Sequence, residues 1–112
     1  MSIPPLYSHL DVHDVVAMRQ RNESFLLIDV REPNEYAIAH IDDAVLHPMS
    51  GSLDWASAID RATPIVVMCH HGIRSAHVAT TLIQQFGFHR VANMSGGIEA
   101  WSLLIDTNIP RY

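Results

Sequence analysis

The sequence predicts a three-layer α/β domain in which a mainly parallel sheet is covered by helices on both faces. Two apolar runs, at residues 25–30 and 64–69, are typical of strands buried on both sides. Each run is followed by a helical stretch, and this alternation favours right-handed crossovers between parallel strands. The chain has 112 residues, of which 48% are hydrophobic, so we expect one domain over residues 1–112.

The individual elements follow from apolar spacing and from the residues that start or stop them. Asp11 suits the N-cap of the first helix, Ser52 caps a short third helix, and Gly87 stops the fourth. The glycine pair at 96–97 predicts a plain turn before the last helix. Strands are expected at residues 25–30, 44–46, 64–69 and 90–92. Helices are expected at residues 11–18, 32–39, 52–60, 75–86 and 98–104.

Charge and composition exclude several classes of function. The net charge is −5, and all seven basic residues are arginines spread along the chain, so no nucleic-acid partner is expected. A single cysteine excludes an internal disulfide and a self-contained dithiol redox cycle. No apolar run approaches the ~20 residues of a membrane span, and no secretory signal is visible. We therefore expect a cytoplasmic protein with no membrane partner.

The segment that begins at Cys69 carries the strongest chemical signal. A thiol ends a buried strand, a short loop with one glycine follows, and a helix then begins. Amide groups at the start of a helix have no partners within it, and the helix dipole adds positive potential. Both effects favour a thiolate, and Arg74 adds a fixed cation that can hold an oxyanion. We expect a nucleophilic sulfur in an anion-binding cradle, although a lone buried cysteine is often only a small inert hydrophobe.

Spacing narrows the chemistry of this loop. Four residues separate Cys69 from Arg74, whereas cysteine enzymes that transfer phosphate have five residues between the two. The shorter loop suits a smaller transferred group, such as one sulfur atom. Cys69, His70, His71 and His77 also suggest a metal site. However, adjacent ligands match zinc spacing poorly and there is no second cysteine, so we expect no metal and no other cofactor.

Three segments resemble the rhodanese family, and the resemblance spans residues 11–104. The loop CHHGIRS resembles the persulfide-forming loop of single-domain rhodaneses, LIDVREPNEYAIAHIDDAV resembles the family's first signature, and NMSGGIEAW resembles its C-terminal signature. The resemblance implies a mainly parallel sheet of about five strands. The sequence departs from the first signature at Ala39, where glycine is usual, and it has no lysine to attract thiosulfate.

Carried over residue by residue, the resemblance makes Cys69 the nucleophile and sulfur carrier. The backbone of the following loop and the start of the next helix would bind the donor, and Arg74 would attract it. Asp29 and Arg31 would brace the site, an interpretation compatible with a plain local ion pair. The substrate-binding residues would be His70, His71, Gly72, Ile73, Arg74 and Ser75. Whether the two histidine side chains take part or only their amides is left open, with the amides favoured.

The resemblance implies a thiosulfate sulfurtransferase that needs no cofactor. Cys69 would take a sulfane sulfur from a small donor such as thiosulfate and pass it to cyanide or a thiol. A protein donor or acceptor is also compatible with it. A binding or persulfide-sensing module with low activity is the main alternative. Phosphatase or arsenate reductase chemistry is a weaker one, because of the short loop and the single thiol.

Overall fold

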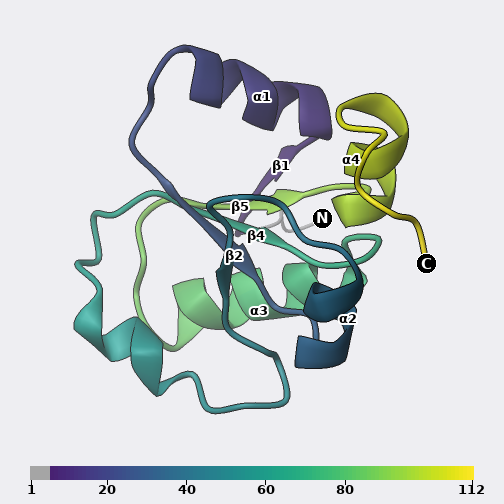
Figure 1. The fold of residues 1–112 in the computed structure, drawn as a ribbon. Coiled ribbons are helices and arrows are strands. Elements are labelled where there is room, and N and C mark those ends of the chain that lie inside the picture. Colours follow the sequence, from purple (N-terminus) through teal and green to yellow (C-terminus); the bar gives the residue numbers. More distant parts are fainter. Residues whose placement is uncertain (1–5) are drawn as a thin grey trace, which may run out of the picture.

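The computed structural model describes residues 6–112, which form a sheet between two layers of helices (Figure 1). All strand pairings are parallel, in the order β1-β5-β4-β2-β3. The strands are β1 (Ser8–Leu10), β2 (Leu26–Asp29), β3 (Val45–Leu46), β4 (Ile65–Met68) and β5 (Val91–Met94). The expected three-layer α/β architecture with a five-stranded parallel sheet is therefore confirmed.

Helices α1 and α4 pack on one face of the sheet, and α3 packs on the other with a short 3₁₀ helix, η1 (Figure 1). Helix α2 lies near the end of the sheet where Cys69 is found. The helices are α1 (Val12–Gln20), α2 (Pro33–Ile38), η1 (Asp54–Ala58), α3 (Ile73–Gln84) and α4 (Gly97–Leu104). Within the described part of the chain, none of these helices is long and apolar enough to cross a membrane.

Strand β4 shows how the sequence produces two cores. Its four residues are all buried, and successive side chains point to opposite faces. Val66 and Met68 pack in the cluster with α1 and α4, whereas Ile65 and Val67 pack in the cluster with α3. Because both faces are covered, an uninterrupted apolar run is what this central strand requires.

Two expectations about the elements were wrong. Strand β1 was missed because Ser8, His9 and Leu10 are too short and too polar for a periodic signal; the strand exists because it pairs with β5 at the sheet edge. The helix expected over residues 52–60 is a 3₁₀ helix of five residues. Its N-cap is Leu53 and not Ser52, although the Ser52 hydroxyl accepts a hydrogen bond from the Asp54 amide at 2.9 Å.

Several boundaries were predicted closely. The Asp11 side chain caps α1 by accepting from the Asp14 amide at 2.8 Å. Helix α3 begins at Ile73, two residues earlier than expected, because Gly72 takes a left-handed conformation (φ 109°) just before it. The absence of a secretory signal was inferred partly from residues 1–5, and these lie outside the described residues.

Candidate active site

Cys69 follows β4, the central strand, at its carboxyl end. Its side chain is buried, and three donors point at the Sγ atom. These are the Gly72 amide at 3.1 Å, the Ser75 amide at 3.4 Å and the Ser75 hydroxyl at 3.3 Å. The loop therefore curls around the sulfur, and the first turn of α3 completes the cradle. Open parallel sheets bind ligands at this edge.

Hydrogen bonds govern the ionisation of this thiol. Burial on its own raises the pKa of Cys69, because a charge is poorly solvated in the core. The Ser75 hydroxyl and the amides of Ser75, Gly72 and His71 lower the pKa, and together they outweigh burial. The pKa of Cys69 therefore lies below its ordinary value, and more thiolate is present at neutral pH.

Asn93 on β5 supports the cradle from the neighbouring strand. Its buried amide group donates to the Gly72 carbonyl at 3.0 Å and accepts from the Ser75 hydroxyl at 2.5 Å. The Ser75 hydroxyl has one proton, which it can give either to Asn93 or to the sulfur of Cys69. A thiolate at Cys69 attracts that proton more strongly than an amide oxygen does. The contact between the Ser75 hydroxyl and the Cys69 sulfur therefore favours the ionised sulfur.

The start of α4 is fixed directly on the loop. The Ile98 amide donates to the Cys69 carbonyl at 2.9 Å, and the Glu99 amide donates to the His70 carbonyl at 3.1 Å. Gly97 allows this approach, because a Cβ atom there would lie 2.3 Å from the Cys69 carbonyl oxygen. The glycine pair expected to form only a turn therefore also sets how closely α4 meets the loop.

Arg74 is paired with Glu35 from α2. Its two terminal nitrogens lie 2.6 and 2.9 Å from the two oxygens of that carboxylate. The hydrogen bond from Arg74 is the main reason that the pKa of Glu35 falls to about 2, so the pair is charged throughout the physiological pH range. Glu35 also raises the pKa of Arg74, and the charge of Cys69 adds to this effect. Arg74 thus lies near the thiolate, but with part of its charge already compensated.

Asp29 and Arg31 form a fully buried ion pair at the end of β2, with 2.7 Å between the Arg31 Nη2 and Asp29 Oδ2 atoms. Arg31 also donates to the Ala39 carbonyl at 2.7 Å and to the Tyr112 hydroxyl at 2.8 Å. That hydroxyl in turn donates to Glu35 at 2.8 Å. The pair therefore reaches the active-site loop through Glu35, which agrees with both a local ion pair and a bracing role.

Among the loop side chains, those of His71 and Ile73 are exposed and that of His70 is partly buried. His70 stacks between His71 and Tyr112, with 4.1 Å between ring centroids in each case. Ile73 is 81% exposed, an unusual position for a large apolar residue. The amides of this segment therefore line the sulfur, while its side chains form the surrounding surface.

Sequence reasoning missed four residues at this site: Glu35, Asn93, Glu99 and Tyr112. Asn93, Glu99 and Glu35 fall inside the two outer segments that were noticed, but nothing in a single sequence gives them a role. Tyr112 carries no signal at all, because its contacts depend on where the last residues fold back. Of the expected loop residues, Gly72, Ser75 and the amide of His71 donate to the Cys69 sulfur.

A cavity of about 420 Å³ lies at the opposite edge of the sheet, where β1, β4 and β5 begin. Its lining includes Ser8, Asp14, Ile65 and Arg90, and it is far from the thiol. The candidate site is therefore identified by Cys69 and the donors around its sulfur, and not by this cavity.

Comparisons with known proteins identify the family of this chain. The family model described as Rhodanese-like domain matches residues 11–104. A thiosulfate sulfurtransferase, GlpE, of Vibrio cholerae is 33% identical over 95 residues, which cover 85% of this chain and 88% of that protein. The GlpE of Coxiella burnetii is 34% identical over 94 residues, which cover 84% of this chain and 83% of that protein. The crystal structure of a rhodanese-like domain protein from Staphylococcus aureus superposes with a TM-score of 0.78 at 24% identity, over 94% of this chain and 98% of that one.

Proposed function

The chain belongs to the rhodanese-like domain family, and from that premise we propose that it is a sulfurtransferase that carries sulfur as a persulfide on Cys69. One observation carries the proposal: the amides of Gly72 and Ser75 and the hydroxyl of Ser75 converge on a single buried sulfur. These donors favour the thiolate before reaction. The same cradle is suited to the charge of a persulfide after it.

In the first half-reaction, the Cys69 thiolate attacks the outer sulfur of a donor such as thiosulfate. A sulfur–sulfur bond forms on the protein while the sulfur–sulfur bond of thiosulfate breaks. Sulfite leaves with the bonding electron pair, and Cys69 becomes a persulfide anion. No proton transfer is needed, which agrees with a site whose donors are mainly amides.

In the second half-reaction, a nucleophile attacks the outer sulfur of the persulfide. Cyanide yields thiocyanate and a thiolate anion yields a new persulfide, and in both cases Cys69 returns as a thiolate. The two halves share one intermediate, so ping-pong kinetics are expected. Donor and acceptor are small molecules in this scheme, and a protein that carries a persulfide fits the same chemistry.

Arg74 attracts the anionic donor in this scheme, but as one half of a pair with Glu35. The loop amides from His70 to Ser75 bind the sulfur being transferred, and Asp29 and Arg31 hold the Glu35 side of the site. Because Glu35 compensates part of the Arg74 charge, attraction of a dianion is weaker than a free arginine would give.

The proposal is tested by measuring intact mass under non-reducing conditions after incubation with thiosulfate. We expect a gain of one sulfur atom that cyanide removes, and no gain in Cys69→Ser. Ser75 and the loop amides remain in that variant, so it isolates the thiol. No gain with thiosulfate and none with a glutathione persulfide donor would contradict the proposal and favour a binding module.

A phosphatase on the same fold is the competing enzyme. The segment between Cys69 and Arg74 holds four residues, and Arg74 is already engaged by a carboxylate. Both features disfavour a phosphoryl group seated directly over the Cys69 sulfur, whereas thiosulfate brings only its outer sulfur atom to that position. Hydrolysis of an aryl phosphate that is lost in Cys69→Ser would reverse this ranking.

A further inference from the structure

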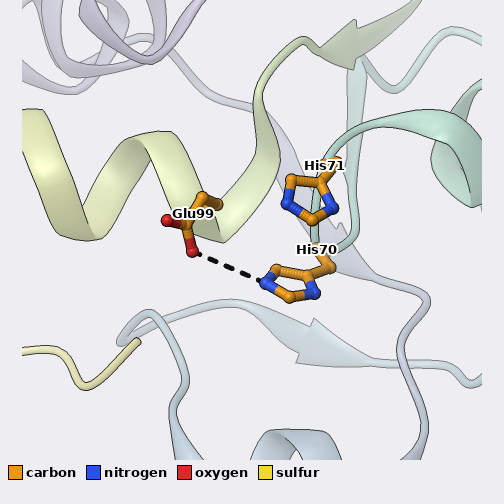
Figure 2. Close-up of side chains that lie close together, drawn as sticks. All are labelled: His70, His71 and Glu99. Carbon is orange, nitrogen blue, oxygen red and sulfur yellow. Dashed lines mark ion pairs between the residues drawn. The ribbon is translucent and has the colours of Figure 1, made fainter. Parts of the chain in front are cut away.

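Three side chains that can bind a metal ion lie together on the outer side of the loop. His70 and His71 come from the loop, and Glu99 comes from the first turn of α4 (Figure 2). One potential ligand atom from each of them lies within 4.8 Å of the others. Two imidazoles and one carboxylate suit zinc and neighbouring divalent transition metals.

The backbone holds these side chains close together. The Glu99 amide donates to the His70 carbonyl at 3.1 Å, so α4 and the loop are joined at the cluster itself. Arg111 donates to the Oε1 atom of Glu99 at 2.7 Å, which leaves Oε2 directed at His70. Metal-binding carboxylates are commonly oriented by such an outer hydrogen bond.

The His70 Nε2 atom has no hydrogen-bond partner although it is buried. It lies 3.6 Å from Glu99 Oε2, which is too long for a good hydrogen bond (Figure 2). Two ligands of one tetrahedral zinc ion, each about 2.0–2.2 Å from it, are about 3.3–3.6 Å apart. The spacing of the two atoms therefore fits a pair of ligands better than it fits a direct contact.

We propose that His70, His71 and Glu99 bind one divalent transition-metal ion of the zinc type. His71 is exposed, so its ring can turn from its stacked position towards the ion and leave a path for entry. Three protein ligands leave one position open to water or to an added ligand. The ion links the loop that carries Cys69 to α4. This site is independent of the sulfur-transfer proposal.

The sequence argued against a metal here because it considered only Cys69 and its neighbouring histidines. Adjacent histidines alone remain a poor site. The third ligand, Glu99, lies far along the chain and reaches them only because Gly97 lets α4 approach the loop.

The test is a calorimetric titration with Zn²⁺ in a Cys69→Ser background, which removes the thiol as a competing ligand. We expect one ion per chain, and at least about tenfold weaker binding in Glu99→Gln and in His71→Asn. His77→Asn is the matched control, because His77 is an exposed histidine on α3 outside the cluster. The Zn²⁺ affinity of this variant should stay within about twofold of that of the Cys69→Ser background protein. Circular dichroism confirms that each variant is folded.

Absorption by Co²⁺ gives a second readout, since bound Co²⁺ reports its coordination. A tetrahedral spectrum that is lost in Glu99→Gln supports the site. Zn²⁺ binding that is unchanged in Glu99→Gln, or that falls equally in His77→Asn, would overturn it. The absence of Zn²⁺ binding in the folded Cys69→Ser protein would also overturn the proposed site.

Discussion

Among single residues, Ser75 has the largest expected influence on the reactivity of Cys69. It contributes a hydroxyl and an amide to the sulfur, and its hydroxyl also contacts Asn93. Removing the hydroxyl leaves the amides in place. Ser75 is therefore a positioning residue whose effect can be measured on the thiol itself.

We expect Ser75→Ala to raise the pKa of Cys69, because a hydrogen bond to the thiolate is lost. Alkylation by iodoacetamide at pH 7 should slow by about tenfold, since a bond to a charged group contributes ~1.5 kcal/mol or more. The rates should converge at high pH, where both thiols are ionised. Thr80→Ala is the control, because the Thr80 hydroxyl donates to the Ala76 carbonyl within its own helix and not to Cys69. Equal slowing in both variants, or a pH-independent effect, would refute this assignment.

The buried ion pair between Asp29 and Arg31 is expected to stabilise the fold as well as to support the site. Both side chains are fully buried, so Arg31→Ala leaves an uncompensated carboxylate in the core. The free energy of unfolding in urea should fall by ~3–5 kcal/mol. Arg21→Ala breaks an exposed pair with Glu23 and should cost less than ~1 kcal/mol. Similar losses in the two variants would be the contrary result.

Turnover distinguishes bracing from a purely local ion pair. If Arg31 supports the site through Glu35, a folded Arg31→Ala variant should also show a lower kcat with thiosulfate. Arg31→Lys keeps the positive charge but loses the planar guanidinium group. Its kcat should therefore lie between those of the unmodified protein and Arg31→Ala. An unchanged kcat in folded Arg31→Ala would remove Arg31 from the site.

At the scale of elements, the junction between the loop and α4 depends on Gly97. This residue has a φ of 57°, and an added Cβ would lie 2.3 Å from one carbonyl oxygen and 2.4 Å from the next. Backbone atoms cannot move aside as a flexible side chain can. The loop and the helix must therefore separate if any side chain is placed here.

We expect Gly97→Ala to destabilise the fold and to displace the loop, with a loss above ~3 kcal/mol. Gly87→Ala is the matched control, since Gly87 has a φ of 74° but nothing within 4 Å of an added Cβ. That variant should lose only ~1–2 kcal/mol, the cost of the left-handed backbone. Thermal unfolding measures both, and a Gly97→Ala variant that fails to fold beside a folded Gly87→Ala agrees with the prediction. Equal losses would show that strain alone matters.

For the molecule as a whole, we propose that residues 6–112, which the structure describes, unfold as one cooperative unit. The two core clusters lie on opposite faces of one sheet, and β4 contributes side chains to both. Trp101 is buried in one cluster, and Trp55 packs against the other and stacks on His47. Each tryptophan therefore reports on one face of the sheet.

Single-tryptophan variants test this cooperativity. In Trp55→Phe the fluorescence reports the α1 and α4 face, and in Trp101→Phe it reports the α3 face. Each fluorescence transition in urea should coincide with that variant's own circular dichroism transition, as expected for two-state unfolding. Separate midpoints within one variant would mean that the two faces unfold independently.

The apolar pattern of the sequence was enough to predict the fold class and to place Cys69 at the carboxyl end of a buried strand. Continuous apolar runs at β2 and β4 are buried on both faces, so local pattern and global fold agree there. Cys69 ends one of these runs, and that places it at the edge of the sheet where ligands bind. Asp11 marked the start of the first helix correctly, because capping is a local property.

The surroundings of the Cys69 sulfur depend instead on tertiary contacts. Three residues reach the site from other parts of the chain: Asn93 from β5, Glu35 from α2 and Tyr112 from the C-terminal segment. Their contacts depend on the strand order and on how the C-terminal segment packs against the site. The short polar strand β1 and the meeting of Glu99 with His70 arose in the same way. Local propensity acts over a few residues, whereas these contacts join residues far apart in the chain. Their positions follow from packing and from the close approach that Gly97 permits.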